Sequence, residues 1–266
     1  MTTLAPPSFS WTGGGIHVEV LAGAGLLAGL YAGAWLLRQS PRPRHLPVLF
    51  GGGLLALVLA LNGPLHDLSD YYLFSAHMVQ HLVLALVVPP LLLSGTPGWM
   101  ADAVLGPVLA WRPSAAVARG LTRPLPALAI YAGTMAAWHL PPLYGAALDN
   151  HAWHVVQHLT MLATATVAWW PVLSPASRLP ALPYAAQLLY VFVFGIPMTV
   201  VAALVTNADQ VLYPFYDAAP RLFGLTPLED QRLGGLIMWV PAGVVPLIVF
   251  SVVYFRWVAA EREDFA

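Results

Sequence analysis

The chain of 266 residues is 59% hydrophobic and only 9% charged, and its formal net charge is −1. A soluble domain carries about 25% charged residues, so this composition excludes an ordinary soluble protein and predicts an integral membrane protein. The near-neutral charge gives no sign of a nucleic-acid partner. The lack of cysteine excludes disulfides, thiolate metal sites and thiol catalysis.

Apolar segments, taken in chain order, predict about seven transmembrane helices. A helix needs about 20 apolar residues to cross a bilayer, and the candidate segments cover residues 16–37, 46–62, 71–94, 124–141, 151–173, 184–205 and 233–256. The second and the fourth are short. No linker is long enough to separate two domains, so we expect an all-α, polytopic bundle that forms a single domain over residues 1–266. The N-terminal stretch lacks basic residues, and we therefore expect no cleaved signal peptide.

Glycine and proline predict two further features of these helices. Gly25, Gly29 and Gly33 recur at four-residue spacing, which suits close packing against another helix but also reflects the usual composition of membrane helices. Proline removes a backbone hydrogen bond, so prolines inside the apolar segments are expected to kink their helices. These prolines are Pro89, Pro90, Pro197, Pro241 and Pro246.

Arginine predicts the orientation, because basic residues concentrate in cytoplasmic loops. If the N-terminus lies outside, two arginines fall on the outer side and nine on the inner side: Arg38, Arg42, Arg44, Arg112, Arg119, Arg123, Arg178, Arg256 and Arg262. We therefore predict an outside N-terminus and a cytoplasmic C-terminus.

Two near-identical strings predict an intramembrane site: HMVQHL (77–82) and HVVQHL (154–159). An HxxxH spacing places two imidazoles on one face of a helix, and ionisable residues inside a membrane usually serve function. In the predicted orientation, eight of the nine histidines fall on the outer side or in the outer half; the exception is His45. One metal site formed by His77, His81, His154 and His158 is the favoured interpretation, and interhelical hydrogen bonding is the alternative.

Other polar or sulfur-containing side chains reach the same predicted layer. The weaker candidate ligands are Asp230, His151, His139, His66, Met161, Met198 and Met238. Gln80 and Gln157 precede the second histidine of each pair, where they would hydrogen-bond to ligating imidazoles. Imidazole suits zinc, copper, iron and nickel, and thioether adds a preference for Cu(I). No glutamate follows the first histidine of either pair, so the HExxH pattern of metalloproteases is absent.

Four stretches carry a resemblance to a known family: YYLFSAHMVQHLVLALVVPPLLLSGTP (71–97), WHLPPLYGAAL (138–148), HAWHVVQHLTMLATATVAWWPVL (151–173) and DQRLGGLIMWVP (230–241). Together they resemble the CtaG family of cytochrome c oxidase assembly factors, over roughly residues 45–257. The resemblance points to His77, His81, His154, His158 and Asp230, with His66, His139 and His151 as weaker carry-overs.

The resemblance implies a non-enzymatic, multi-pass protein with seven helices in the bacterial plasma membrane. Such a protein would serve respiratory-chain biogenesis by helping to assemble a haem–copper oxidase, for example by supplying copper. Zinc and iron stay open as the bound metal. The implied partners are oxidase subunits and the lipid bilayer, and a homo-oligomer is left open.

Two other classes of function stay open beside this one. A histidine-ligated membrane metalloenzyme, of the zinc hydrolase or di-iron type, would need a carboxylate or similar base beside the metal, and Asp230 is the best candidate in the sequence. A haem electron carrier would need one histidine from each of two helices, and a visible absorption band would identify it.

Overall fold

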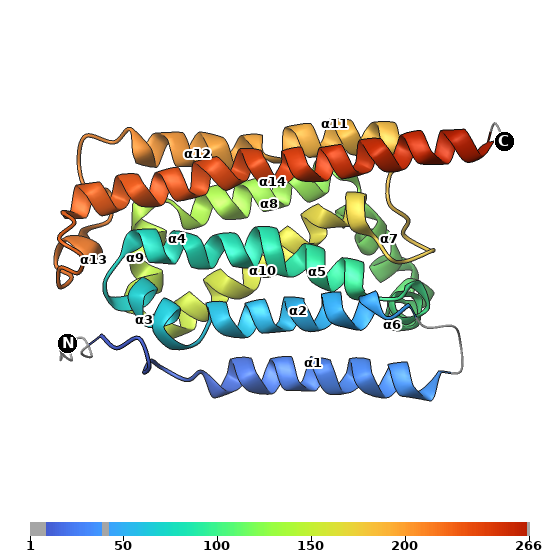
Figure 1. The fold of residues 1–266 in the computed structure, drawn as a ribbon, viewed down its shortest axis with the longest axis horizontal. Coiled ribbons are helices and arrows are strands. Elements are labelled where there is room, and N and C mark those ends of the chain that lie inside the picture. Colours follow the sequence, from blue (N-terminus) through green and yellow to red (C-terminus); the bar gives the residue numbers. More distant parts are fainter. Residues whose placement is uncertain (1–8, 39–42, 265–266) are drawn as a thin grey trace.

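The computed structural model describes residues 9–38 and 43–264, and the described part is an antiparallel array of helices without strands (Figure 1). Arg42, one of the arginines used for orientation, lies outside the described residues. The helices are α1 (Val18–Leu37), α2 (His45–Ala60), α3 (Gly63–Tyr71), α4 (Phe74–Leu82), the π-helix η1 (Val83–Val87), α5 (Val88–Gly95), α6 (Gly98–Ala110), α7 (Arg112–Leu121), α8 (Pro124–Trp138), α9 (Pro141–Asp149), α10 (His151–Leu173), α11 (Tyr184–Phe194), α12 (Ile196–Thr206), α13 (Pro214–Asp217) and α14 (Pro227–Asp264).

Helices occupy each of the seven predicted segments, but fewer of them qualify alone as membrane spans. Among the described residues, four helical stretches are long and apolar enough, namely Val18–Leu37, Phe74–Gly95, Tyr184–Thr206 and Pro227–Arg262. A fifth is added if α2 and α3, which are bent by 44°, form one broken span. Helix α8 has only 15 residues, about 22 Å of length, and α10 carries the polar side chains of the HVVQHL string. An all-helical membrane protein is thus confirmed, with four or five clear spans.

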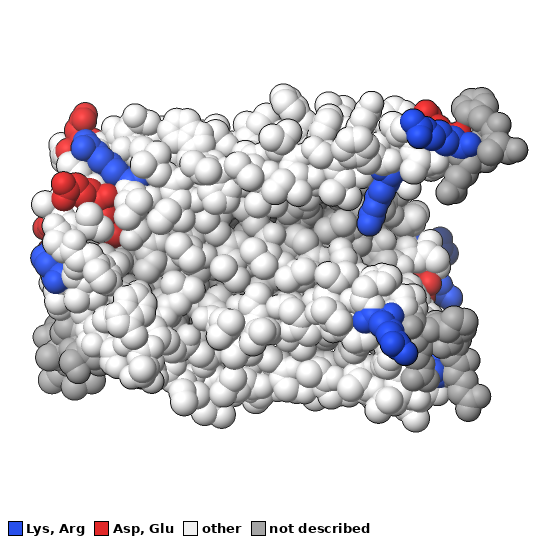
Figure 2. Space-filling view, in the orientation of Figure 1, with Lys and Arg blue, Asp and Glu red and all other residues white. Residues whose placement is uncertain are grey.

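Charged side chains lie toward the two ends of the bundle, and the face between them is uncharged over most of its length (Figure 2). Helices α3, α9 and α13 gather at one end, whereas α6 and α7 lie at the other end with the end of α14 (Figure 1). None of these five short helices belongs to the central part of a predicted span. An uncharged belt between two charged ends is the surface that a bilayer requires.

The third predicted span is irregular at its middle, where η1 separates α4 from α5. Pro89 has no N–H, so the carbonyl of Ala85 loses its ordinary α-helical partner. The indole Nε1–H of Trp169 donates to this carbonyl instead, at 2.8 Å. Trp169 lies on α10 and is buried. This hydrogen bond ties the helix of the first histidine pair to the helix of the second, and α10 also packs directly against η1 and α5.

Glycine allows close approach at some of these helix contacts but not at those expected. A Cβ on Gly95 would lie 2.3 Å from the backbone nitrogen of Phe50, so α5 can meet α2 this closely only with glycine there. By contrast, a Cβ on Gly25, Gly29 or Gly33 would meet nothing within 4 Å. The prediction that α1 packs closely through these three glycines is therefore wrong for contacts within this chain. The expected break at Pro197 coincides with the α11–α12 junction, while α14 continues through Pro241 and Pro246.

Candidate metal centre

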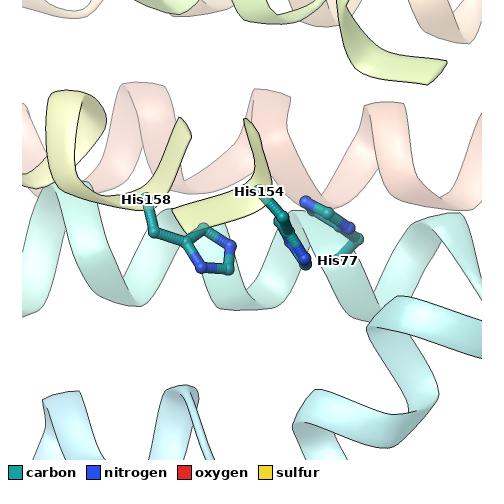
Figure 3. Close-up of side chains that lie close together, drawn as sticks. All are labelled: His77, His154 and His158. Carbon is teal, nitrogen blue, oxygen red and sulfur yellow. The ribbon is translucent and has the colours of Figure 1, made fainter. Parts of the chain in front are cut away.

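The two histidine pairs meet in one buried cluster. Ligand nitrogens of His77, His154 and His158 all lie within 4.8 Å of one another. Figure 3 shows the three rings gathered between two helices, with His77 on α4 and the other two on α10. All three residues are buried, with His77 completely inaccessible at 0% exposure. Helical spacing places His154 and His158 on the same face of α10, and the packing of that face toward α4 completes the cluster.

His81 and His139 extend this cluster. Nε2 of His81 lies 2.8 Å from Nε2 of His77, and its ring centroid lies 5.8 Å from those of His158 and His139. His139 follows α8, and its Nδ1 donates to the carbonyl of Met135 at 2.6 Å. The buried imidazoles thus form a continuous group rather than two separate pairs.

Tyr216 fixes the protonation of His77. Its hydroxyl donates to the carbonyl of Ser69 at 2.6 Å, and burial raises the pKa of Tyr216 well above its usual value, so the hydroxyl keeps its proton. Nδ1 of His77, 3.1 Å away, must therefore be the donor to the Tyr216 oxygen. This assignment leaves Nε2 of His77 with a free lone pair, which accepts from His81. The same lone pair is the one that a metal ion would use.

Asp70 plays the corresponding part for His154. One oxygen of the Asp70 carboxylate lies 3.4 Å from Nδ1 of His154 and 3.2 Å from Nε2 of His66. The Gln80 amide donates to the other nitrogen of His66 at 2.9 Å, so the ring proton of His66 lies on Nε2, beside the carboxylate. The negative carboxylate likewise favours a proton on Nδ1 of His154. Nε2 of His154 is then unprotonated. A carboxylate behind a histidine is the usual arrangement around ligating imidazoles.

Four nitrogens of the cluster lack any hydrogen-bond partner among the described residues. They are Nδ1 of His81, Nε2 of His139, Nε2 of His154 and Nε2 of His158. A buried polar atom left unpaired costs about 1–3 kcal/mol, so a concentration of such atoms in one place requires an explanation. Unpaired lone pairs on several neighbouring imidazoles are a suitable donor set for a first-row transition metal. The residues present therefore fit a metal ion.

The structure places Asp230, His151 and the three candidate methionines outside this cluster. Asp230 accepts hydrogen bonds from the backbone N–H groups of Phe74 and Ser75, at 2.7 and 3.2 Å, and from the Ser75 hydroxyl. The carboxylate thus caps the N-terminus of α4, one turn before His77. His66 joins the cluster through Asp70, whereas His151 is exposed and lies 4.0 Å from Glu19.

The three candidate methionines are buried in apolar surroundings. Met161 packs with Trp138 and Ala147, and both Met198 and Met238 belong to the main hydrophobic core. Of the two candidate glutamines, Gln80 supports His66, whereas both amide atoms of Gln157 lack a partner within the described part of the chain.

Sequence reasoning missed the carboxylate and the tyrosines of the site. Asp70 follows His66 at a spacing of four residues, which puts both on one helix face, and this HxxxD pattern was the available signal. No local pattern marks Tyr216 or Tyr144, whose hydroxyls lie 3.2 Å apart. Asp230 was the carboxylate predicted to lie near the histidines, but Asp70 is the carboxylate in contact with the buried ones.

A cavity of about 380 Å³ reaches the cluster from the side of α1. Apolar side chains of α1, α2 and α10 form most of its wall. His66, His154 and His158 line its inner part, and His17, Glu19 and His151 also contribute to its lining. Of the buried imidazoles, His66, His154 and His158 therefore border a cavity on one side of the bundle.

The fold and this centre define a helical membrane protein with a buried, histidine-rich candidate metal site. Residues 29–260 match the family model described as cytochrome c oxidase caa3 assembly factor (Caa3_CtaG), and the chain belongs to this family. The match confirms the resemblance found in the sequence. It covers every histidine of the buried cluster, and it begins within α1.

Three mycobacterial proteins, all described as uncharacterised, are similar to this chain. One from Mycobacterium leprae (strain TN) is 25% identical over 80% of this chain and 35% of its own length. Proteins of Mycobacterium bovis and Mycobacterium tuberculosis are each 24% identical over 72% of this chain and 31% of their own length. The chain thus spans about a third of the curated relatives it matches. No solved structure matches it.

Proposed function

We propose that this protein is an assembly factor of the bacterial plasma membrane that binds copper at the buried histidines and supplies it to a haem–copper oxidase. The observation that carries the proposal is the set of unpartnered imidazole nitrogens around His77, His154 and His158. The family description, which names oxidase assembly, supplies the recipient of the metal.

The donor set favours copper, with zinc and iron as the other metals that imidazoles hold. Charge balance supports Cu(I) in particular, since one monovalent cation and the carboxylate of Asp70 would leave the site neutral. A net charge inside a membrane is costly. The thioethers of Met161, Met198 and Met238 would serve as further Cu(I) ligands only after a rearrangement of their apolar surroundings.

The proposed membrane topology has seven spans, an outside N-terminus and a cytoplasmic C-terminus. Two observations support it. The start of α1 and the end of α14 lie at opposite ends of the bundle, as an odd number of crossings requires (Figure 1). The short helices α2 and α8 also run alongside the clear spans (Figure 1). In this topology the histidine cluster lies toward the outer face, so copper would enter and leave without crossing the bilayer.

A membrane metalloenzyme is the second candidate function, and Asp70 is the observation that favours it. A carboxylate beside three imidazoles is the set from which a zinc hydrolase draws its ligands and its general base. Both histidines that contact Asp70 direct their protons at it, however, so the carboxylate is engaged rather than open to a water molecule.

The test is complementation of a deletion strain with the wild type and with site variants. The site variants are His77→Ala, His158→Ala and a quadruple variant in which His77, His81, His154 and His158 are all changed to Ala. The control variant is His45→Ala. His45 is an exposed histidine at the start of α2 and provides the matched control. Changes around a metal site cost about 10–100-fold in affinity even when no ligand is lost. We expect the site variants to insert normally, to lower oxidase activity and oxidase-bound copper, and to be partly rescued by excess copper.

Three outcomes would contradict the proposal. Full oxidase activity with the quadruple variant would leave a scaffold role without copper transfer. Lost activity with normal oxidase copper would favour the metalloenzyme or a structural role of the histidines. A visible absorption band in the purified protein would indicate haem instead.

A further inference from the structure

The segment that precedes α1 is fixed to the turn between α2 and α3. The backbone nitrogen of Gly63 donates to the carbonyl of Gly15 at 2.9 Å, and that of Gly15 donates to the Asp67 carboxylate at 3.0 Å. The backbone nitrogen of His17 donates to the side-chain oxygen of Asn62 at 2.7 Å. Three hydrogen bonds therefore hold His17 in a defined place.

Glycine makes this contact possible. Gly14 has a φ of +123°, and a Cβ there would lie 2.5 Å from the carbonyl carbon of Gly63. Only glycine tolerates both the backbone conformation and the approach. The segment leading into α1 is thus built for one position against the α2–α3 turn, above the cavity that leads to the buried histidines.

This anchoring brings three potential ligands together at the rim of the cavity. Ligand atoms of His17, Glu19 and His151 lie within 4.8 Å of one another. Nδ1 of His17 is 3.1 Å from an oxygen of Glu19, and Nε2 of His151 is 4.0 Å from the same oxygen. The side chains of Glu19 and His151 are 57% and 69% exposed. Two imidazoles and a carboxylate, open to solvent, form a donor set for a first-row transition cation.

Imidazoles continue from this rim to the buried centre. The ring of His17 lies 4.2 Å from that of His66, centroid to centroid, and His66 lies 6.0 Å from His154. His154 is in turn 4.3 Å from His158 and 5.4 Å from His77. The same cavity is lined by residues of both groups. The cavity thus leads from the rim past His66, whose two nitrogens are engaged by Gln80 and Asp70, to the unpartnered Nε2 atoms of His154 and His158.

The geometry points to a second, peripheral metal site at His17, Glu19 and His151, which captures the ion and passes it along the cavity to His154 and His158. Each transfer breaks one bond from the metal to a ligand and forms one to the next imidazole. The oxidation state of the metal does not change, and no electron donor is needed. The inference rests on the proposed function, because it takes the buried cluster as the destination.

The test uses the purified full chain and Cu(I) supplied anaerobically from a coloured chelator complex, so that transfer is followed by absorbance. Bound metal is then counted by elemental analysis. The rim variant is Glu19→Gln with His151→Ala, and the buried variant is His158→Ala. A matched control combines Glu261→Gln with His45→Ala, because both residues are exposed and lie outside the lining of the cavity.

We expect wild type and control to bind two equivalents of copper, and each of the other two variants to bind about one. The rim variant should also fill its buried site at least about tenfold more slowly, to the same final level. If the rim variant matches wild type in stoichiometry and rate while His158→Ala loses copper, the peripheral site is wrong and the proposed function stands. If His158→Ala binds as wild type does, the buried destination is wrong, and both proposals fail.

Discussion

Asp230 offers the sharpest test of the site's architecture, because its position assigns it to helix capping rather than to metal ligation. Its carboxylate accepts from two buried backbone N–H groups, those of Phe74 and Ser75, and from the Ser75 hydroxyl. The first-turn N–H groups of a helix have no partner within the helix. Asp230 supplies that partner from another helix, and in doing so it holds the start of α4 in place.

The expected cost follows from these contacts. Loss of an N-cap acceptor destabilises a helix by about 0.5–2 kcal/mol, and each buried donor left unpaired costs about 1–3 kcal/mol. Asp230→Ala leaves three buried donors, two backbone N–H groups and the Ser75 hydroxyl, without this acceptor. It also removes a carboxylate that is costly to bury, so we expect a loss of about 3 kcal/mol. Asp230→Asn retains one acceptor oxygen, and we expect a loss of about 1 kcal/mol.

Thermal unfolding in detergent, with and without copper, measures this loss. For a chain of this size, 3 kcal/mol corresponds to a fall in melting temperature of about 6–12 °C, and the fall should be the same in metal-free and copper-loaded protein. Asp209→Ala, which changes an exposed carboxylate in the connection before α14, is the control. If Asp230→Ala loses bound copper at unchanged metal-free stability, the capping argument is refuted and Asp230 is a ligand.

Two further predictions concern the proton on His77 and the topology. Tyr216→Phe removes the acceptor that holds the Nδ1 proton of His77, so copper affinity, measured by chelator competition, should fall about 10–100-fold. The control Tyr254→Phe, at an exposed position, should leave copper affinity unchanged. Equal copper affinities of Tyr216→Phe and wild type would show that Tyr216 does not set the tautomer of His77. A C-terminal fusion to alkaline phosphatase should be inactive and one to a fluorescent protein bright, because the arginine asymmetry places that end in the cytoplasm. The reverse pattern would overturn the orientation.

The main elements of the fold follow from hydrophobicity, because long apolar segments can only be helices in a membrane. The helices at the ends of the bundle do not. The four residues of α13 carry Tyr216 into the site, but so short a helix has no periodic pattern and exists only through its tertiary contacts. The number of clear spans also differs from the sequence prediction, since α8 is short and the polar face of α10 lowers its hydropathy.

The candidate site was predictable where its residues share a helix and hidden where they do not. HxxxH spacing brings His77 beside His81 and His154 beside His158 within their own helices. The role of Asp230 depends on a contact with a residue 156 positions away along the chain, which no local pattern encodes. Asp70 shares a helix face with His66, but only the approach of His154 from α10 makes it the partner of a second imidazole.

The π-helix between α4 and α5 has a consequence for how such a site can diverge. A π turn holds one residue more than an α turn within about the same rotation, so it absorbs an extra residue without turning the two halves of the span against each other. Deleting one residue between Val83 and Val87 would restore a plain α-helix and leave His77 and His81 facing their present neighbours. Deleting one residue of α10 between His158 and Trp169, where no π turn absorbs the change, would turn one half of that helix by about 100°. In this family, a one-residue gap at η1 would therefore matter less than the same gap in α10.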